Sequence, residues 1–214
     1  MKYRAVLPFF VVFLGVAAGA HAASSPLGTI VYLEGNVTVD ARSASIGDVV
    51  PYGATIRTDA ASECDVAFRE KNIVRLGELT TLVFNPGNLQ VGSSLERGSL
   101  ALVLKNLVNG AAQDHNFYIR TPTTAAGVRG TLFFIRVEDP QTTYVCTCNG
   151  TIQLEDGSKV GERDVRAAHH VAYRIHSEGG SLSVTSAPLL YHTDADMEAL
   201  AARVGVTVDW TTAQ

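Results

Sequence analysis

The chain has 214 residues, of which 46% are hydrophobic and 18% are charged. That balance provides enough apolar material for a folded core and excludes a largely disordered chain. The 21 acidic residues outnumber the 17 basic ones, and no cluster of Lys and Arg is present, so the sequence excludes a nucleic-acid partner.

The first 22 residues have the three parts of a secretory signal peptide. Lys2 and Arg4 form a basic start, residues 5–18 are mostly apolar, and residues 20–22 read Ala-His-Ala. The apolar run is shorter than the ~20 residues that a spanning helix needs; an uncleaved anchor helix is the alternative. We expect cleavage after Ala22 and a periplasmic or secreted protein without a membrane span. Loss of two basic residues, from 17 to 15 against 21 acidic ones, gives the mature chain a net charge of −6.

Residues 27–185 alternate short β-like runs with Gly, Asn and Asp, and they show no sustained helical period. Pairs such as Gly47-Asp48 and Asn149-Gly150 are typical of turns. The pattern predicts an all-β domain, a compact β-roll or sandwich of short strands. Residues 31–39 align with residues 146–154, and an internal strand–Gly–strand repeat is one interpretation of that similarity.

Residues 186–214 form a tail with a different pattern. Thr193 is a suitable N-cap for a helix with acidic residues in its first turn, and Gly205 is a suitable stop. The apolar positions at helical spacing are Met197, Leu200 and Val204. We predict a short amphipathic α-helix over about residues 194–204, packed on the sheet. Residues 206–210 either add an edge strand or pack against the domain.

The most distinctive motif lies in residues 119–133, where Thr121-Pro122 precedes a small-residue link and then Val128-Arg129-Gly130-Thr131. Shorter motifs accompany it in the order Gly35-Asn36-Val37, Ile46-Gly47-Asp48, Gly53–Thr58, Val74–Gly77 and Gly98–Leu100. In these features the chain, from about Gly28 to Val171, resembles the FecR domain family. The resemblance implies a compact β-roll or sandwich and a place in the bacterial cell envelope.

The regulators for which that family is named relay an iron-uptake signal from an outer-membrane receptor to a sigma factor. This chain departs from their pattern because an expected signal peptide stands where they have a sigma-binding region and a transmembrane helix. It also has Cys146-Thr147-Cys148 where relatives have apolar residues, and Ala168-His169-His170 where a Gly is common.

Cys146 and Cys148 are two residues apart on a predicted strand, so their side chains point to the same side. Two thiolates with one or two imidazoles are the donor set of tetrahedral zinc, with iron or copper as alternatives. We therefore predict a metal site from Cys146, Cys148, His192 and one of His169 or His170. Only one of the adjacent histidines joins easily, because neighbouring strand residues face opposite sides.

Two other uses of the cysteines stay open. The alignment places Cys146 and Cys148 opposite Val31 and Leu33, which suggests a core-facing pair of small hydrophobic residues. A disulfide from Cys64 to one of them is the second alternative, since exported proteins meet an oxidising compartment. A bridge between the two themselves is disfavoured, because α-carbons two apart on a strand are separated by about 6.5–7 Å.

These features favour a non-enzymatic binding module of the cell envelope whose partner is another envelope protein or a small ligand. A role in signalling is one interpretation. The alternative is a metal- or redox-sensing protein that works through the Cys146, Cys148 and His cluster. An enzyme is less favoured, because the sequence contains no C-x-x-C, H-E-x-x-H or G-x-S-x-G motif.

Overall fold

The computed structural model describes residues 28–51, 53–69, 71–86, 92–105, 117–155 and 162–213. The expected signal peptide lies outside the described residues. The strands are β1 Gly28–Glu34, β2 Val37–Val39, β3 Arg42–Ser43, β4 Val49–Val50, β5 Ala54–Thr58, β6 Glu63–Phe68, β7 Asn72–Leu76, β8 Thr81–Phe84, β9 Ser93–Val103, β10 Phe117–Arg120, β11 Ala125–Asp139, β12 Thr142–Glu155, β13 Glu162–Ala167, β14 Val171–Glu178 and β15 Ser181–Ala187. The helix α1 is Asp194–Ala202.

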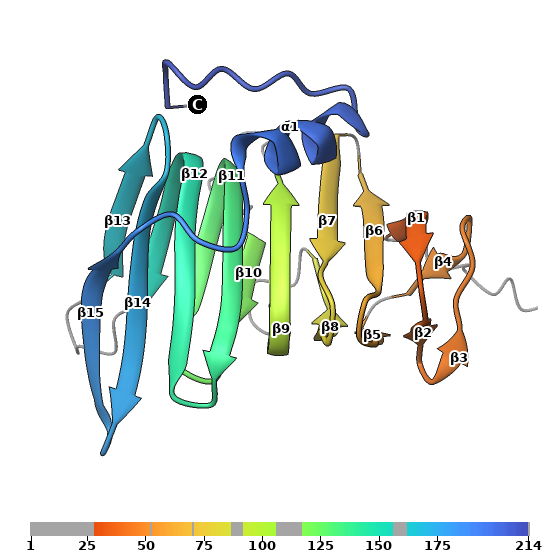
Figure 1. Cartoon of the computed structure of the whole chain (residues 1–214), viewed down its shortest axis with the longest axis horizontal. Helices are drawn as coiled ribbons and strands as arrows, with labels where there is room; N and C mark the ends of the chain where they lie inside the picture. Colours follow the sequence, from red (N-terminus) through yellow and green to blue (C-terminus); the bar gives the residue numbers. More distant parts are fainter. Residues whose placement is uncertain are drawn as a thin grey trace, which may run out of the picture.

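The strands pair in one continuous network that folds over into two layers (Figure 1). The main path of hydrogen-bonded neighbours is β15-β14-β12-β11-β10-β9-β7-β6-β1-β4, and β13, β8, β5, β2 and β3 branch from it. Three long strands belong to both layers. In β12, for example, residues 142–147 pair with β14 and residues 150–155 pair with β13. The predicted all-β sandwich with one short C-terminal helix is confirmed.

Two glycines lie where β11 and β12 pass from one layer to the other. Gly130 has φ +54° and Gly150 has φ +122°. Residues other than glycine rarely adopt these positive φ angles. The pairing register shifts between Arg129 and Leu132. A Cβ on Gly150 would collide with the Thr131 hydroxyl, which donates a 2.7 Å hydrogen bond to the Asn149 carbonyl. The Val-Arg-Gly-Thr motif therefore forms the bend between the layers.

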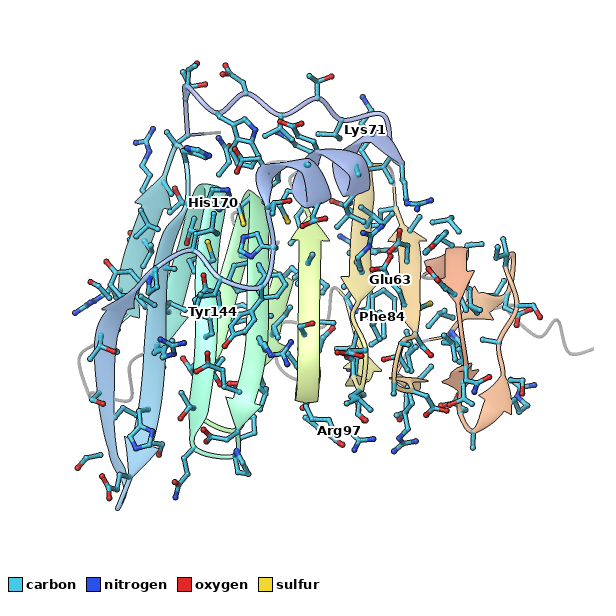
Figure 2. All side chains as sticks on the ribbon, viewed as in Figure 1. Glu63, Lys71, Phe84, Arg97, Tyr144 and His170 are labelled. Carbon is cyan, nitrogen blue, oxygen red and sulfur yellow. The ribbon has the colours of Figure 1, made fainter. Side chains whose placement is uncertain are left out.

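The alternation of side chains along the strands builds two separate cores. Leu100 and Leu102 point into the first core, between the layers, whereas Ala101 and Val103 point into the second. The second core lies on the outer face of the front layer, beneath α1 and the residues around it. Figure 2 shows Tyr144 and His170 on this side of the sheet. Cys146 and Cys148 both face the second core.

The helix α1 crosses the ends of β9 and β7 (Figure 1). It ends two residues before the predicted end, because a turn at Gly205, with φ +66°, leads the chain away from the axis. Thr193 and Asp196 form a capping box at its start, and Met197, Leu200 and Ala201 are fully buried. Residues 206–210 form no strand; Val206, Val208 and Trp210 pack on the second core. In the described ranges, no helix combines the length and hydrophobicity needed to cross a bilayer.

Candidate metal centre

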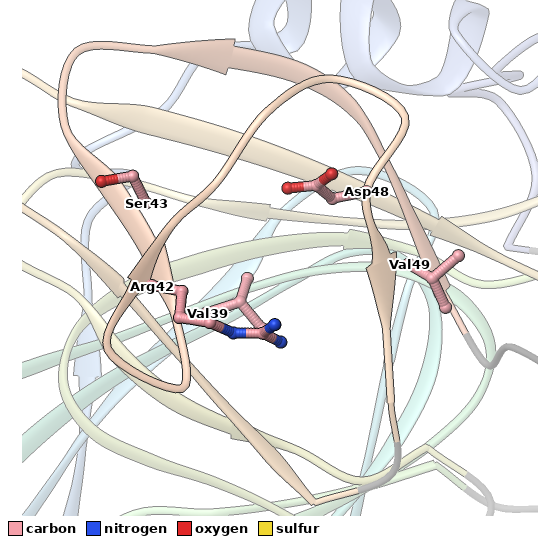
Figure 3. Close-up of a pocket in the computed structure, with 5 residues that line it drawn as sticks. All are labelled: Val39, Arg42, Ser43, Asp48 and Val49. Atoms are coloured by element: carbon pink, nitrogen blue, oxygen red, sulfur yellow. The ribbon is translucent and has the colours of Figure 1, made fainter.

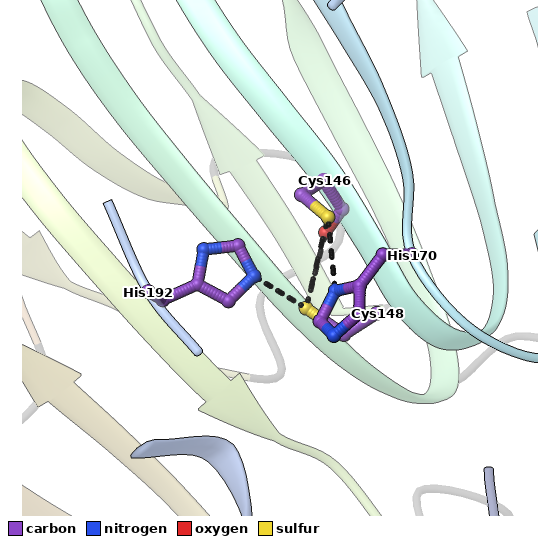
Figure 4. Close-up of side chains that lie close together, drawn as sticks. All are labelled: Cys146, Cys148, His170 and His192. Atoms are coloured by element: carbon purple, nitrogen blue, oxygen red, sulfur yellow. Dashed lines mark hydrogen bonds between the residues drawn. The ribbon is translucent and has the colours of Figure 1, made fainter. Parts of the chain in front are cut away.

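Four side chains from three parts of the chain meet at the edge of the second core (Figure 4). Cys146 and Cys148 lie on β12, and His170 lies in the turn between β13 and β14. His192 belongs to the segment that follows β15, which we call the C-terminal arm and define as residues 188–213. The backbone of His170 has φ +38°, and its N–H donates a 3.0 Å hydrogen bond to the Cys148 carbonyl. This turn points the imidazole back toward β12.

The four donor atoms form a compact group. The two Sγ atoms are 4.0 Å apart, Cys146 Sγ is 3.4 Å from His170 Nδ1, and Cys148 Sγ is 3.2 Å from His192 Nε2. All four donor atoms lie within 4.8 Å of one another.

The three individual distances, one between the sulfurs and two between a sulfur and a nitrogen, are close to the edges of a zinc tetrahedron. With Zn–S bonds of about 2.3 Å and Zn–N bonds of about 2.0–2.1 Å, tetrahedral angles place two sulfurs about 3.8 Å apart and a sulfur and a nitrogen about 3.6 Å apart. The observed distances differ from these edges by a few tenths of an ångström. The donor set of two thiols and two imidazoles also fits zinc chemically, and it accommodates iron or copper.

The outer nitrogen of each imidazole is held by an oxygen acceptor. His170 Nε2 lies 2.7 Å from Asp194 Oδ1, and His192 Nδ1 lies 2.9 Å from the Leu190 carbonyl oxygen. A carbonyl oxygen only accepts, so the neutral His192 ring carries its proton on Nδ1 and directs the Nε2 lone pair at Cys148. In a neutral His170 ring, the Asp194 carboxylate favours the tautomer with the proton on Nε2, which leaves the Nδ1 lone pair for a metal ion. This arrangement of outer partners is typical of metal-bound histidines.

Burial and ring contacts hold the site rigid. Both cysteines are fully buried, and the side chain of His170 is 7% exposed. The His192 ring stacks on Phe134 with centroids 4.4 Å apart, and Trp210 stacks on the His170 ring at 5.1 Å. The site is therefore shielded from water on both sides by aromatic side chains.

The pKa values of the two thiols shift in opposite directions when no ion is bound. A hydrogen bond from Cys148, reinforced by His170 and His192, lowers the pKa of Cys146 to about 4. Burial and the neighbouring Cys146 thiolate raise the pKa of Cys148 above its usual value. Burial acts to lower the pKa of His170, but hydrogen bonds to Cys146 and Asp194 outweigh it and raise that pKa. A bound divalent cation would neutralise two thiolates and displace the remaining proton.

The structure brings Cys146, Cys148 and His192 together with His170, one of the two alternative histidines. The fifth, His169, points away from the sulfurs; its side chain is 52% exposed and its Nε2 lies 3.0 Å from Asp194 Oδ2. Cys64 is free and fully buried in the first core, on the opposite face of the sheet from Cys146 and Cys148. The alternative disulfide from Cys64 is therefore wrong, because the sheet itself separates the thiols.

Sequence reasoning missed the residues that support the ligands. Asp194 was expected only as an acidic residue in the first helical turn, yet it also binds His170 and His169. Phe134 and Trp210 carried no signal beyond their hydrophobicity. The roles of all three residues depend on contacts between segments that are far apart in the sequence. For Asp194, the sequence offers one signal, its position two residues after His192.

A surface cavity (Figure 3) lies beside β2, β3 and β4, and β4 is at the opposite end of the sheet path from β15. It has a volume of about 230 Å³. The lining residues are Val39, Arg42, Ser43, Asp48 and Val49. Asp48 Oδ2 accepts a 2.8 Å hydrogen bond from the Ser45 N–H, so this carboxylate shapes its own loop. The cavity brings no set of metal-ligating or nucleophilic groups together.

Residues 54–153 match the family model described as FecR protein. Over this segment the predicted resemblance to the FecR domain family is confirmed. Cys146 and Cys148 lie inside the matched segment, whereas His170 and His192 lie beyond it.

Similar solved structures include two crystal structures of a candidate anti-sigma factor from Parabacteroides distasonis ATCC 8503, each with 12% identity and a TM-score of 0.47. The alignments cover 62% of this chain and 59% of the solved chains, so this chain spans less than two thirds of their length. No curated protein matches the chain.

Proposed function

We propose that this FecR-domain protein is an exported, non-enzymatic binding module of the bacterial cell envelope that acts in signalling and holds a zinc-type metal ion. The ligands are Cys146, Cys148, His170 and His192. The observation that carries the proposal is the compact group of four donor atoms, within 4.8 Å of one another, whose imidazoles are held by Asp194 and the Leu190 carbonyl.

The donor count favours a structural or sensing ion over a catalytic one. Catalytic zinc has three protein ligands and an open position for water, whereas structural zinc has four. Here four protein donors lie within 4.8 Å of one another, and the cysteines are fully buried. A bound ion would be shielded from substrate, which supports a non-enzymatic role.

Metal analysis tests the proposal. The mature protein, prepared with a non-thiol reductant and without chelator, should contain about one zinc or a related ion per chain. The double variant Cys146→Ser, Cys148→Ser should contain none, and the control Cys64→Ala, in the other core, should retain the wild-type content. If wild type neither carries metal nor takes up added zinc, iron(II) or copper(I), the metal proposal is refuted. An N-terminus at Ala23 after expression in a bacterium would test export.

The partner-binding part of the proposal is supported by β15, which lies at the end of the sheet path and, among the described strands, pairs with β14 alone. Its residues are SLSVTSA, without the charges or prolines that usually protect an edge strand. An extended segment of another envelope protein could therefore add to this edge. A photo-crosslinking side chain at Ser183 should form a discrete adduct in cells, and one at Arg42, on the opposite end of the sheet, should not. Equal labelling from both positions would contradict a specific edge.

A further inference from the structure

We infer that the metal ion fastens the C-terminal arm to the sheet, so that metal occupancy controls whether the second core is covered. This inference rests on the metal site of the proposed function and adds its structural consequence. The ion is then a conditional link between the FecR domain and the arm.

The ligands are divided between the two parts. Cys146, Cys148 and His170 belong to the sheet and its turn, whereas His192 belongs to the arm. Asp194, which holds His170, is also an arm residue. Detaching the arm removes one direct ligand and one supporting carboxylate at the same time.

Thermodynamic linkage makes this division consequential. Loss of a supporting partner alone costs about 10–100-fold in metal affinity. The protein with its arm docked should therefore bind the ion at least 10-fold more tightly than the protein with its arm detached. Coupling is reciprocal, and the ion therefore favours docking over detachment by the same factor.

The arm has other attachments, which define what the ion adds. At the far end of α1, Arg203 Nε lies 2.8 Å from Oδ2 of the fully buried Asp65. The Asn149 amide donates 2.8 Å hydrogen bonds to the carbonyl oxygens of Asp209 and Thr212. Just before His192, the Tyr144 hydroxyl donates a hydrogen bond to the Pro188 carbonyl and accepts one from the Leu190 N–H. None of these contacts involves the His192 imidazole, so the ion would add an attachment between Leu190 and the start of α1.

The surface beneath the arm is apolar, so opening the arm would expose hydrophobic side chains. Met197 and Leu200 are fully buried against the second core, and Leu132 and Val103 on the sheet are also fully buried there. An opened arm would expose both of these apolar surfaces to water. A change in metal supply would thus be converted into a change in exposed hydrophobic surface.

Amide hydrogen exchange tests the inference on the full mature chain. Wild type would be compared with one equivalent of zinc and after complete chelation, with zinc content measured on the same samples. We expect exchange in α1 to become at least 10-fold faster without zinc, while β6 and β7 keep their protection. His192→Ala should show the fast α1 exchange even with zinc present. The control His176→Ala, on β14 outside the site, should behave as wild type.

The outcomes separate the two proposals. Stoichiometric zinc with unchanged α1 exchange overturns the arm inference and leaves the metal site intact. Loss of protection throughout the sheet on chelation also overturns it, because the ion would then stabilise the whole domain. Failure to bind any of zinc, iron(II) and copper(I) refutes both.

Discussion

Replacing Asp194 with Asn tests whether the orientation of His170 matters for metal affinity. Asp194 Oδ1 accepts from His170 Nε2 at 2.7 Å, and Oδ2 lies 3.0 Å from His169 Nε2. The amide keeps the shape of the side chain. It removes the negative charge that makes the His170 imidazole a stronger ligand for the metal ion. Loss of such a partner costs about 10–100-fold in affinity, or about 1.4–2.7 kcal/mol at 25 °C.

The assay is competition for zinc with a chromogenic chelator at fixed pH, using reduced protein. Asp196→Asn is the matched control, since Asp196 lies in the same helical turn and makes its side-chain contacts with Thr193. We expect Asp194→Asn to weaken binding at least 10-fold and Asp196→Asn to change it by less than threefold. Equal affinities for wild type and Asp194→Asn would refute the role given to the carboxylate.

Three further predictions concern the sheet. Burial raises the pKa of Cys64 to about 12, so its thiol should stay unlabelled by a thiol reagent in native protein and react only on unfolding; rapid labelling would contradict its place in the first core. Asp65 is fully buried between Arg75 and Arg203. Asp65→Asn should therefore lower the free energy of unfolding by about 3 kcal/mol in urea titrations; a loss below about 0.5 kcal/mol would be inconsistent with a buried ion pair. Hydrogen bonds from Arg174 lower the pKa of Glu138, so the stabilisation that Glu138→Gln removes should be present at neutral pH and vanish as the pH falls through that lowered pKa; a difference that stays constant in acid would argue against it.

Much of the fold was predictable because period-two patterns and turn residues report directly on strands. The arrangement in two layers was not, since it depends on where β11 and β12 bend, at Gly130 and Gly150, and on which half of each strand meets which neighbour. One available signal pointed to the second core. The run from Leu100 to Leu104 is entirely apolar, which is typical of a strand buried on both faces.

The site was predictable to the extent that it follows strand geometry. Side chains two apart on a strand share a face, and Cys146 and Cys148 do so. The choice between His169 and His170 was beyond that rule, because both lie in a turn and the positive φ of His170 decides which ring turns inward. The part played by Asp194 depends on how the arm docks, which no local pattern encodes.

Two of the four proposed ligands lie inside the segment that matches the FecR family model, and two lie beyond it. The matched segment ends at residue 153; it supplies the strand that carries both cysteines, whereas His170 and His192 follow it. The cysteines would be buried in the second core even without an ion, as two small apolar residues are. Packing alone would not require His170 Nδ1 and His192 Nε2 to lie 3.4 and 3.2 Å from the two sulfurs. Nor would it require Asp194 and the Leu190 carbonyl to hold the outer nitrogens of both rings. These contacts are why we propose a metal site at this position.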